Sequence, residues 1–527
     1  YEDARAPEAE HLGFVLHLGD FIYELVWYPE DRPKGYYARK IRDIVRYPKG
    51  MKIADYHVPV DLNDYRAVWR AYLADPDLQD ARARWPFVAM WDNHEFSFQG
   101  WQSIVQVGKF VQPGQSVKVA ANQAWFEYLP ARVKAPSGSL DAFGPPDVKN
   151  VKIETFDENG LGTEPNNLIA INSLKGYRAL RWGKHLDLII TDQHSYRGPD
   201  PFSDPALDKL GPWGEYQGMF PDELQQVLDG GRAFNGGNPP AELRFKDARV
   251  PNSQKDAPPQ TILGAEQRAW FKDQLKRATA TWKIWGNSQS AFQQRADPEN
   301  LPPGLMKEAW PAGSFGNLGN SDFGNAYIER NEIYDLVRDS KITGFAIVSG
   351  DLHSFWAGYA SAELPPGKFE PIGLSFVGGS LTSPGAAEGN EYTLPKDLPL
   401  RPLFIADRPN GEPPDCTLDM LMRHGVRSCL EYAKTFDLAR ARALSNPALA
   451  PHVEFIDMGG HGYATVRLSA DEMRTEFVCI PRPVTRSESP DGGPLRYRVV
   501  HTAKLWRPGE RPQLTQHVLE GDVGLSI

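Results

Sequence analysis

Polar clusters that each follow a short apolar run hold the residues of this sequence best suited to chemistry. These residues are Asp20 after the first run, Asn93 and His94 after the second, and Asp351 and His353 after a later one. Carboxylate and amide oxygens suit hard cations, and imidazole suits transition metals. Two cations about 3.5–4 Å apart can neutralise phosphate oxygens and generate hydroxide near neutral pH. The residue types therefore indicate metal-dependent ester hydrolysis.

Asp20, Asn93 and His94 also have a purely structural interpretation, which the sequence alone leaves open. Asp20 could bridge two cations, but a lone Asp after glycine is commonly a helix N-cap. Asn93 could offer a carbonyl oxygen to a cation, and His94 could protonate a leaving alkoxide; alternatively, their polar tetrapeptide is a solvated turn. Asp351 and His353 stand two residues apart and would project from one side of an extended segment toward adjacent metals.

The elements expected to position these clusters are buried strands. Apolar runs of strand length cover residues 13–18, 86–91, 186–191, 281–285, 344–348 and 372–377. Helical periodicity over residues 265–277 and 325–339 precedes two of these runs. Alternating helices and apolar strands predict a layered α/β fold, in which ligands bind beyond the carboxyl ends of the strands. The polar clusters are therefore expected to share one site.

The composition narrows the classes of function. The 527 residues carry 58 Lys and Arg against 68 Asp and Glu, a formal charge of -10, which gives no general attraction for nucleic acid or anionic membranes. No apolar run is long enough to span a bilayer. Abundant Pro and Gly predict long surface loops over residues 198–261, 296–325 and 363–415. Cys416 and Cys429 could form one disulfide or remain two buried thiols.

The order of the motifs resembles the signature series of the PhoD-like alkaline phosphatases and phosphodiesterases. The matching motifs are Gly-Asp-Phe-Ile-Tyr-Glu at 19–24, Trp-Asp-Asn-His-Glu at 91–95 and Ser-Gly-Asp-Leu-His at 349–353, with further matches from 192 to 463. The resemblance implies a calcineurin-like four-layer α/β/β/α sandwich, with two packed mixed sheets flanked by helices and long loop insertions. Residues 1–480 would form the phosphatase domain, and residues 481–527 a C-terminal extension packing on it.

The same resemblance, carried over residue by residue, implies a dinuclear or larger metal site of Ca²⁺ and Fe³⁺, with other divalent cations as alternatives. Asp20 would bridge the metals. Tyr23 and His353 would bind the iron, and Asn93 and Asp351 would bind the calcium.

Three further residues would act on the substrate. His94 would be the general acid. Asn287 would approach the second metal or the phosphate, although an Asn that closes a strand turn is equally compatible with the pattern. Arg197 carries a planar donor that could bind phosphate, with a structural arginine as the alternative. His194 departs from the family pattern, which commonly has Arg at this position.

The start of the sequence is the other departure. Family members carry a strand ending in a Cys-containing motif before the Gly-Asp segment, and usually a small β-sandwich domain before that strand. We therefore expect the first strand and first motif to be missing here, and residues 1–11 to form the helix that leads into the Gly-Asp strand.

The resemblance implies a periplasmic or secreted enzyme that hydrolyses small-molecule or polymeric phosphate esters. The alternative is a truncated or non-catalytic relative that binds phosphate esters or anionic wall polymers.

Overall fold

A seven-stranded mixed sheet forms the centre of the computed structural model, which describes residues 7, 11–37, 39–135, 137–139, 141–211, 218–306, 308–319, 322–489 and 492–527. Its order is β18 (Val453–Asp457), β16 (Phe355–Ala360), β17 (Gly373–Val377), β15 (Phe345–Ser349), β12 (Trp282–Asn287), β8 (Leu186–Ile190) and β7 (Arg178–Trp182). The four strands β17, β15, β12 and β8 run parallel, and the outer strands pair antiparallel. The structure therefore confirms that the apolar runs at 186–191, 281–285, 344–348 and 372–377 form strands, and it places all four in one sheet.

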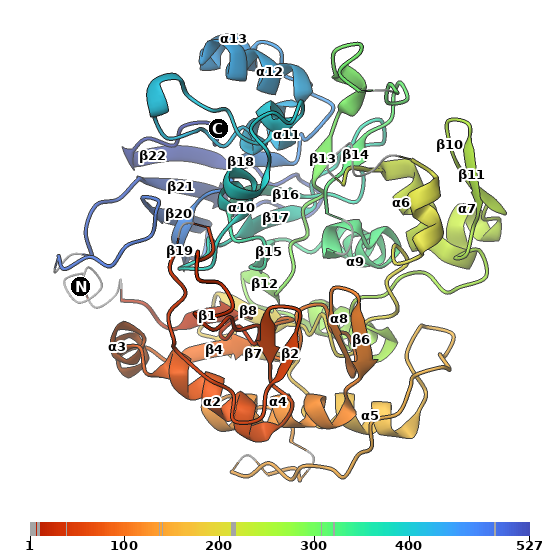
Figure 1. The fold of residues 1–527 in the computed structure, drawn as a ribbon, viewed down its shortest axis with the longest axis vertical. Coiled ribbons are helices and arrows are strands. Elements are labelled where there is room, and N and C mark those ends of the chain that lie inside the picture. Colours follow the sequence, from red (N-terminus) through yellow and green to blue (C-terminus); the bar gives the residue numbers. More distant parts are fainter. Residues whose placement is uncertain are drawn as a thin grey trace.

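A second β layer packs on one face of this sheet (Figure 1). It contains the parallel pair β1 (Val15–Leu18) and β4 (Phe87–Met90), and the antiparallel sheet β19 (His461–Leu468), β20 (Glu472–Ile480), β21 (Tyr497–Lys504) and β22 (Thr515–Gly521). The ring of Phe477 lies 4.9 Å from that of Phe355 and 5.7 Å from that of Phe455. These aromatic contacts join the two layers into one hydrophobic core.

Helices cover both outer faces and complete the four layers. On the far face of the seven-stranded sheet lie α8 (Ala265–Arg277) and α9 (Tyr327–Asp339), and Phe271 of α8 packs 4.4 Å from Trp285 of β12. Beneath β1 and β4 lie α2 (Leu62–Leu73) and α4 (Gln115–Tyr128), at the bottom of Figure 1. The ring centroids of Trp69 in α2 and Phe21 lie 5.5 Å apart. The α/β/β/α sandwich expected from the sequence is confirmed.

The remaining described elements are short or lie at the periphery. The strands are β2 (Met51–Ile53), β3 (Tyr56–Val58), β5 (Ile104–Val107), β6 (Phe110–Pro113), β9 (Phe220–Pro221), β10 (Glu242–Phe245), β11 (Ala248–Pro251), β13 (Arg295–Ala296) and β14 (Gly316–Asn317). The helices are α3 (Pro76–Arg84), α5 (Pro165–Ile171), α6 (Asp222–Gly230), α7 (Phe234–Gly237), α10 (Ala386–Thr393), α11 (Leu418–His424), α12 (Val426–Thr435) and α13 (Leu438–Arg442).

The region 198–261 differs from the expected loop, because it contains helix α6 and the hairpin of β10 and β11. Its apolar residues Leu224, Leu228 and Leu243 enter a second hydrophobic cluster that extends to α11 and α12. Pro and Gly mark the ends of these elements and obscure their short periodicities in the sequence.

Three further expectations concern the chain ends, the cysteines and the membrane. The boundary expected at residue 480 falls between β20 and β21, which pair along their length, so residues 497–521 complete the second sheet. The helix expected over residues 1–11 falls almost entirely outside the described residues. All three cysteines are described and are free thiols. Within the described residues, no helix has the length and apolarity needed to cross a membrane.

Candidate active site

The candidate site forms where two pairs of parallel strands end. Leu18 at the end of β1 pairs with Met90 at the end of β4, which brings the two following loops together. On the central sheet, Asn287 at the end of β12 pairs with Ser349 at the end of β15. This arrangement is the expected one for ligands bound beyond the carboxyl ends of parallel strands.

Glu95 fastens the loop after β1 to the loop after β4. Its buried carboxylate accepts hydrogen bonds from the backbone N–H groups of Asp20 at 3.0 Å, Phe21 at 2.5 Å, Ile22 at 3.3 Å and Asp92 at 2.8 Å. One side chain therefore fixes the backbone on both sides of the site. Such multiple N–H donation also satisfies a carboxylate that burial has removed from water.

Asp20, Tyr23 and His353 converge although His353 is far away in the sequence. The Tyr23 hydroxyl lies 3.2 Å from Oδ2 of Asp20 and 2.9 Å from Nε2 of His353, and that Nε2 lies 3.9 Å from the same carboxylate oxygen. Nδ1 of His353 donates to the carbonyl oxygen of Pro384 at 2.8 Å, which leaves the lone pair on Nε2. Burial, with the negative charge of Asp20, raises the pKa of the Tyr23 phenol well above its usual range.

Backbone strain concentrates at the expected ligands. Asp20, Asp351 and His353 have φ values of 54°, 63° and 46°, in the left-handed region that residues with a Cβ rarely adopt. Gly19 has a φ of 103°, and a Cβ at this position would lie 2.3 Å from Cβ of Asp92. Strain of this kind gathers at functional sites, where the surrounding structure holds it in place.

His94 and Glu24 form a buried pair beside this group. Nδ1 of His94 lies 2.5 Å from Oε2 of Glu24, and the His94 ring lies 4.2 Å from that of Tyr23. Burial lowers the pKa of His94, but the charges of Glu24 and Asp20 outweigh this effect, and the pKa rises to about 9. The imidazole therefore carries a proton at neutral pH, as a general acid requires.

Asn93 presents an oxygen to the site. Its Nδ2 donates to the carbonyl oxygen of Phe98, while its buried Oδ1 has no hydrogen-bond partner among the described residues. Next to it, Oδ1 of Asp92 lies 2.7 Å from Nε2 of His194 and accepts a hydrogen bond from Ser288 at 2.5 Å. Oδ2 of Asp92 is likewise unpartnered within the described part of the chain. Both oxygens are positioned to receive a cation or a water molecule.

Negative charge accumulates around Asp351. Burial and the charges of Asp92 and Asp322 raise the pKa of Asp351 well above its usual range. Arg197, also buried, lies in the same electrostatic environment: burial lowers its pKa, and the charges of Asp200 and Asp322 oppose that change. A bound cation would relieve the repulsion between these carboxylates, and Arg197 offers a planar donor for an anionic ligand.

Asn287 lies at the carboxyl end of β12, where its side chain also stabilises a turn. Its Oδ1 accepts a hydrogen bond from the backbone N–H of Gln289 at 3.2 Å. Its fully buried Nδ2 has no hydrogen-bond partner among the residues that the structure describes. The side chain therefore closes the strand turn and still keeps a donor that could be used by a ligand.

A second group of polar residues holds the segment that contains Pro384. Glu388 accepts hydrogen bonds from the N–H of Gly385 at 3.3 Å and from Arg39 at 2.7 Å, and lies 3.1 Å from Nε2 of His461. Nδ1 of His461 lies 3.3 Å from the carbonyl oxygen of Ser380. These contacts fix both ends of the segment whose carbonyl orients His353.

Sequence reasoning assigned no role to several residues that build the site. These are Glu24, Asp92, Glu95, His194 and Glu388. Three of them, Glu24, Asp92 and Glu95, lie inside the recognised motifs at 19–24 and 91–95, and this position was the available signal. The contacts of Glu388 and His194 join segments far apart in the chain and leave no local pattern.

The donors at the strand ends include side chains other than His, Cys, Asp and Glu. In the described part of the chain, no group of three or more His, Cys, Asp or Glu side chains could hold a metal ion by itself. The expected set, however, also uses a phenol and an amide oxygen. Asp20, Tyr23 and His353 are in mutual contact, and the unpartnered Oδ1 of Asn93 adds a hard donor. This mixture of oxygen and nitrogen donors fits a cation site.

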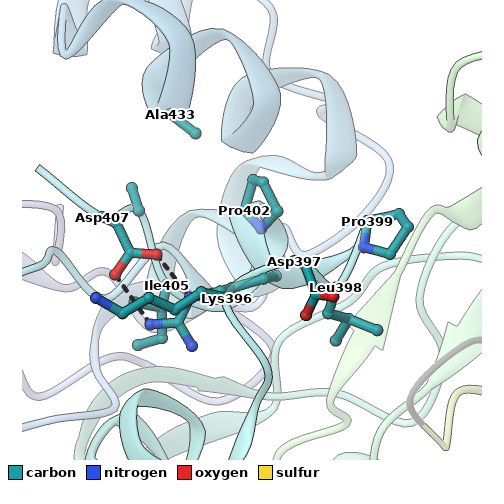
Figure 2. Close-up of a pocket in the computed structure, with 10 residues that line it drawn as sticks. Lys396, Asp397, Leu398, Pro399, Pro402, Ile405, Asp407 and Ala433 are labelled. Atoms are coloured by element: carbon teal, nitrogen blue, oxygen red, sulfur yellow. Dashed lines mark hydrogen bonds and ion pairs between the residues drawn. The ribbon is translucent and has the colours of Figure 1, made fainter.

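A pocket elsewhere on the molecule contains none of these residues. Its volume is about 330 Å³, and its lining residues include Lys396, Pro399, Arg401, Asp407 and Ala433 (Figure 2). Arg401 and Asp407 pair at 2.6 Å, so the buried guanidinium is already neutralised. The pocket is therefore separate from the cluster at the strand ends.

The chain is an α/β/β/α sandwich that carries a cluster of carboxylate, amide and imidazole groups at its strand ends. Residues 1–477 match the family model described as PhoD-like phosphatase, and the chain belongs to this family. It is 23% identical over 380 residues to alkaline phosphatase D of Bacillus subtilis (strain 168), covering 71% of this chain and 47% of that protein. The chain thus spans about half the length of this relative.

A solved structure described as the structure of PhoD has the same fold. It matches with a TM-score of 0.54 and 16% sequence identity, covering 97% of this chain and 67% of that chain.

Proposed function

We propose that this chain hydrolyses phosphomonoesters or phosphodiesters by a metal-dependent reaction without a covalent intermediate. The observation that carries the proposal is the contact of Asp20 with both Tyr23 and His353, next to the buried pair of His94 and Glu24. These residues supply cation donors and a proton donor within one cluster. Membership of the PhoD-like phosphatase family supports the same chemistry.

The metals would be Ca²⁺ and Fe³⁺, with other divalent cations as alternatives. Asp20 would lie between them, Tyr23 and His353 would bind the iron, and Asn93 and Asp351 would bind the calcium. When bound, the metals would supply positive charge for the phosphate oxygens and lower the pKa of a water molecule. Since burial and the charge of Asp20 raise the pKa of the Tyr23 phenol, a phenolate ligand at this position would require a strongly charged cation such as Fe³⁺ to displace the proton.

The protein side chains would bind the substrate and move the proton. Glu24 holds Nδ1 of His94, so the proton on Nε2 is the one available to the leaving oxygen. Arg197 would bind the phosphate oxygens through its guanidinium. Nδ2 of Asn287 would donate to the phosphate, since this buried donor has no described partner.

The proposal is tested by hydrolysis of p-nitrophenyl phosphate and bis-p-nitrophenyl phosphate, together with elemental analysis of the same samples. We expect bound metal and turnover, with both lost in Asp20→Ala and His353→Ala. His94→Gln should keep the metal and lose turnover, which separates the proton donor from the cation donors. Phosphate binding without any turnover would instead favour the non-catalytic relative. A periplasmic or secreted location stays a prediction.

A further inference from the structure

Phe98 is an exposed aromatic residue beside the proposed general acid. It is 39% exposed, while its ring lies nearly parallel to the buried imidazole of His94, with centroids 5.3 Å apart and an interplanar angle of 25°. Covering apolar surface so that it leaves water is favourable, roughly in proportion to the area covered. The free part of the ring is therefore a surface that a bound molecule can cover.

The backbone of Phe98 is held by two residues of the site. Its N–H donates to Oε1 of Glu24 at 2.5 Å, and its carbonyl oxygen accepts a hydrogen bond from Nδ2 of Asn93. The other oxygen of Glu24 contacts His94, so one carboxylate binds both the imidazole and the backbone that carries the phenyl ring. With its backbone held and its ring stacked on His94, Phe98 loses less conformational entropy on contact with a ligand than a residue of a free loop would.

The position of Phe98 relative to His94 assigns it to one side of the substrate. In the proposed hydrolysis, the general acid protonates the leaving oxygen, and the group attached to this oxygen must lie next to His94. The ring that stacks on His94 therefore borders the leaving group.

We propose that Phe98 is a specificity-determining residue that contacts the leaving group, so that the site prefers phosphate esters with an aryl or other flat apolar leaving group. This inference rests on the proposed function, because it needs His94 on the leaving-group side. Aromatic pairs in contact correspond to a roughly 2- to 13-fold change in kcat/KM.

The first test compares phenyl phosphate with methyl phosphate. Phe98→Ala should lower the ratio of their kcat/KM values by about fivefold, and Phe98→Trp should preserve it. The intrinsic reactivities of the two esters cancel when this ratio is compared between variants. Alanine retains both backbone hydrogen bonds, so the variant removes the ring alone. Phe156→Ala is the matched control, because Phe156 is 41% exposed and its ring stacks on Trp101.

The second test measures binding without turnover, with phenylphosphonate and methylphosphonate as probes. Tighter binding of phenylphosphonate, lost in Phe98→Ala but kept in Phe156→Ala, supports the contact. The binding measurement supports the contact even if the chain hydrolyses no ester. Absence of hydrolysis would contradict the proposed function alone. Equal loss of kcat/KM for both esters shows that Phe98 merely supports Glu24, and equal binding of the two phosphonates removes the preference; either result overturns the inference.

Discussion

Glu24 and His94 share a hydrogen bond of 2.5 Å in a part of the site where both side chains are buried. The bond occupies Nδ1 of the imidazole and places its negative partner away from Nε2. The carboxylate of Glu24 also supplies much of the negative charge that raises the pKa of His94 to about 9. Glu24 thus orients the proposed general acid and, together with Asp20, favours its protonated form.

Glu24→Gln should reduce kcat by roughly 10²–10⁴-fold, the usual range for general acid catalysis. Loss of the negative charge lowers the pKa of His94, so the alkaline limb of the pH–rate profile should move to lower pH. Steady-state rates between pH 6 and pH 10 measure both effects. A variant with normal kcat and an unmoved limb would show that His94 does not depend on Glu24.

Gly19→Ala should impair both stability and activity, because its φ is 103° and the new Cβ would lie 2.3 Å from Cβ of Asp92. We expect a loss of about 2 kcal/mol or more in the free energy of unfolding, and a large fall in kcat. Gly183→Ala is the control, since Gly183 has a φ of 58° with open space around it. That variant should lose only about 1–2 kcal/mol and keep its activity.

Removal of metal should abolish turnover and lower the midpoint of thermal unfolding, because a cation that binds only the folded state stabilises it. Added Ca²⁺ should restore part of the activity after treatment with a chelator. A ferric ion bound to a phenolate would absorb visible light, and Tyr23→Phe should lose this absorption. Turnover that survives complete chelation would contradict the proposed metal dependence.

Glu388→Ala should loosen the segment that contains Pro384. The change leaves Arg39, His461 and the N–H of Gly385 without their common acceptor. We expect kcat to fall more than binding of inorganic phosphate, since Pro384 would no longer hold His353 in one orientation. Glu388→Gln retains acceptor capacity and should recover part of the rate. A thermal melt of each variant distinguishes this positional effect from general unfolding.

The strand ends could be predicted because each strand is a mainly apolar run, and most of these runs are followed within three residues by Asp, Asn or His. Helix α8 was predicted with its observed bounds for the same kind of reason, since Phe271 and Leu275 repeat with helical spacing on its buried side. By contrast, α6 and the hairpin of β10 and β11 are short and bounded by Pro and Gly, so their periodicity is too brief to detect.

The supporting contacts of the site were beyond sequence reasoning for a different reason. His194 contacts Asp92 across 102 residues of sequence, and Glu388 contacts His461 across 73. Such pairs depend on the packing of whole layers, and no local spacing encodes them. The residue types of the site could therefore be predicted, but the contacts that orient them could not.

Acid sensitivity should arise from histidines that are buried in the core and lie outside the site. Burial lowers the pKa of His452 to about 3 and that of His501 to about 4, against 6.5 in the unfolded chain. As the pH falls below 6.5, these two histidines become protonated in the unfolded chain but stay neutral in the folded chain. The free energy of unfolding should therefore fall, by about 1.4 kcal/mol per pH unit for each histidine, until their folded-state pKa values are reached.

The double variant His452→Gln, His501→Gln should flatten this dependence, because glutamine keeps a donor for the backbone carbonyl oxygen of Gln293 and for the side-chain Oε1 of Gln516 without titrating. Urea unfolding at pH 7.5 and pH 5 gives the two free energies to compare. The exposed His517→Gln is the matched control and should behave as the unmodified chain. Equal acid destabilisation of the double variant and the unmodified chain would show that other groups set the acid limit.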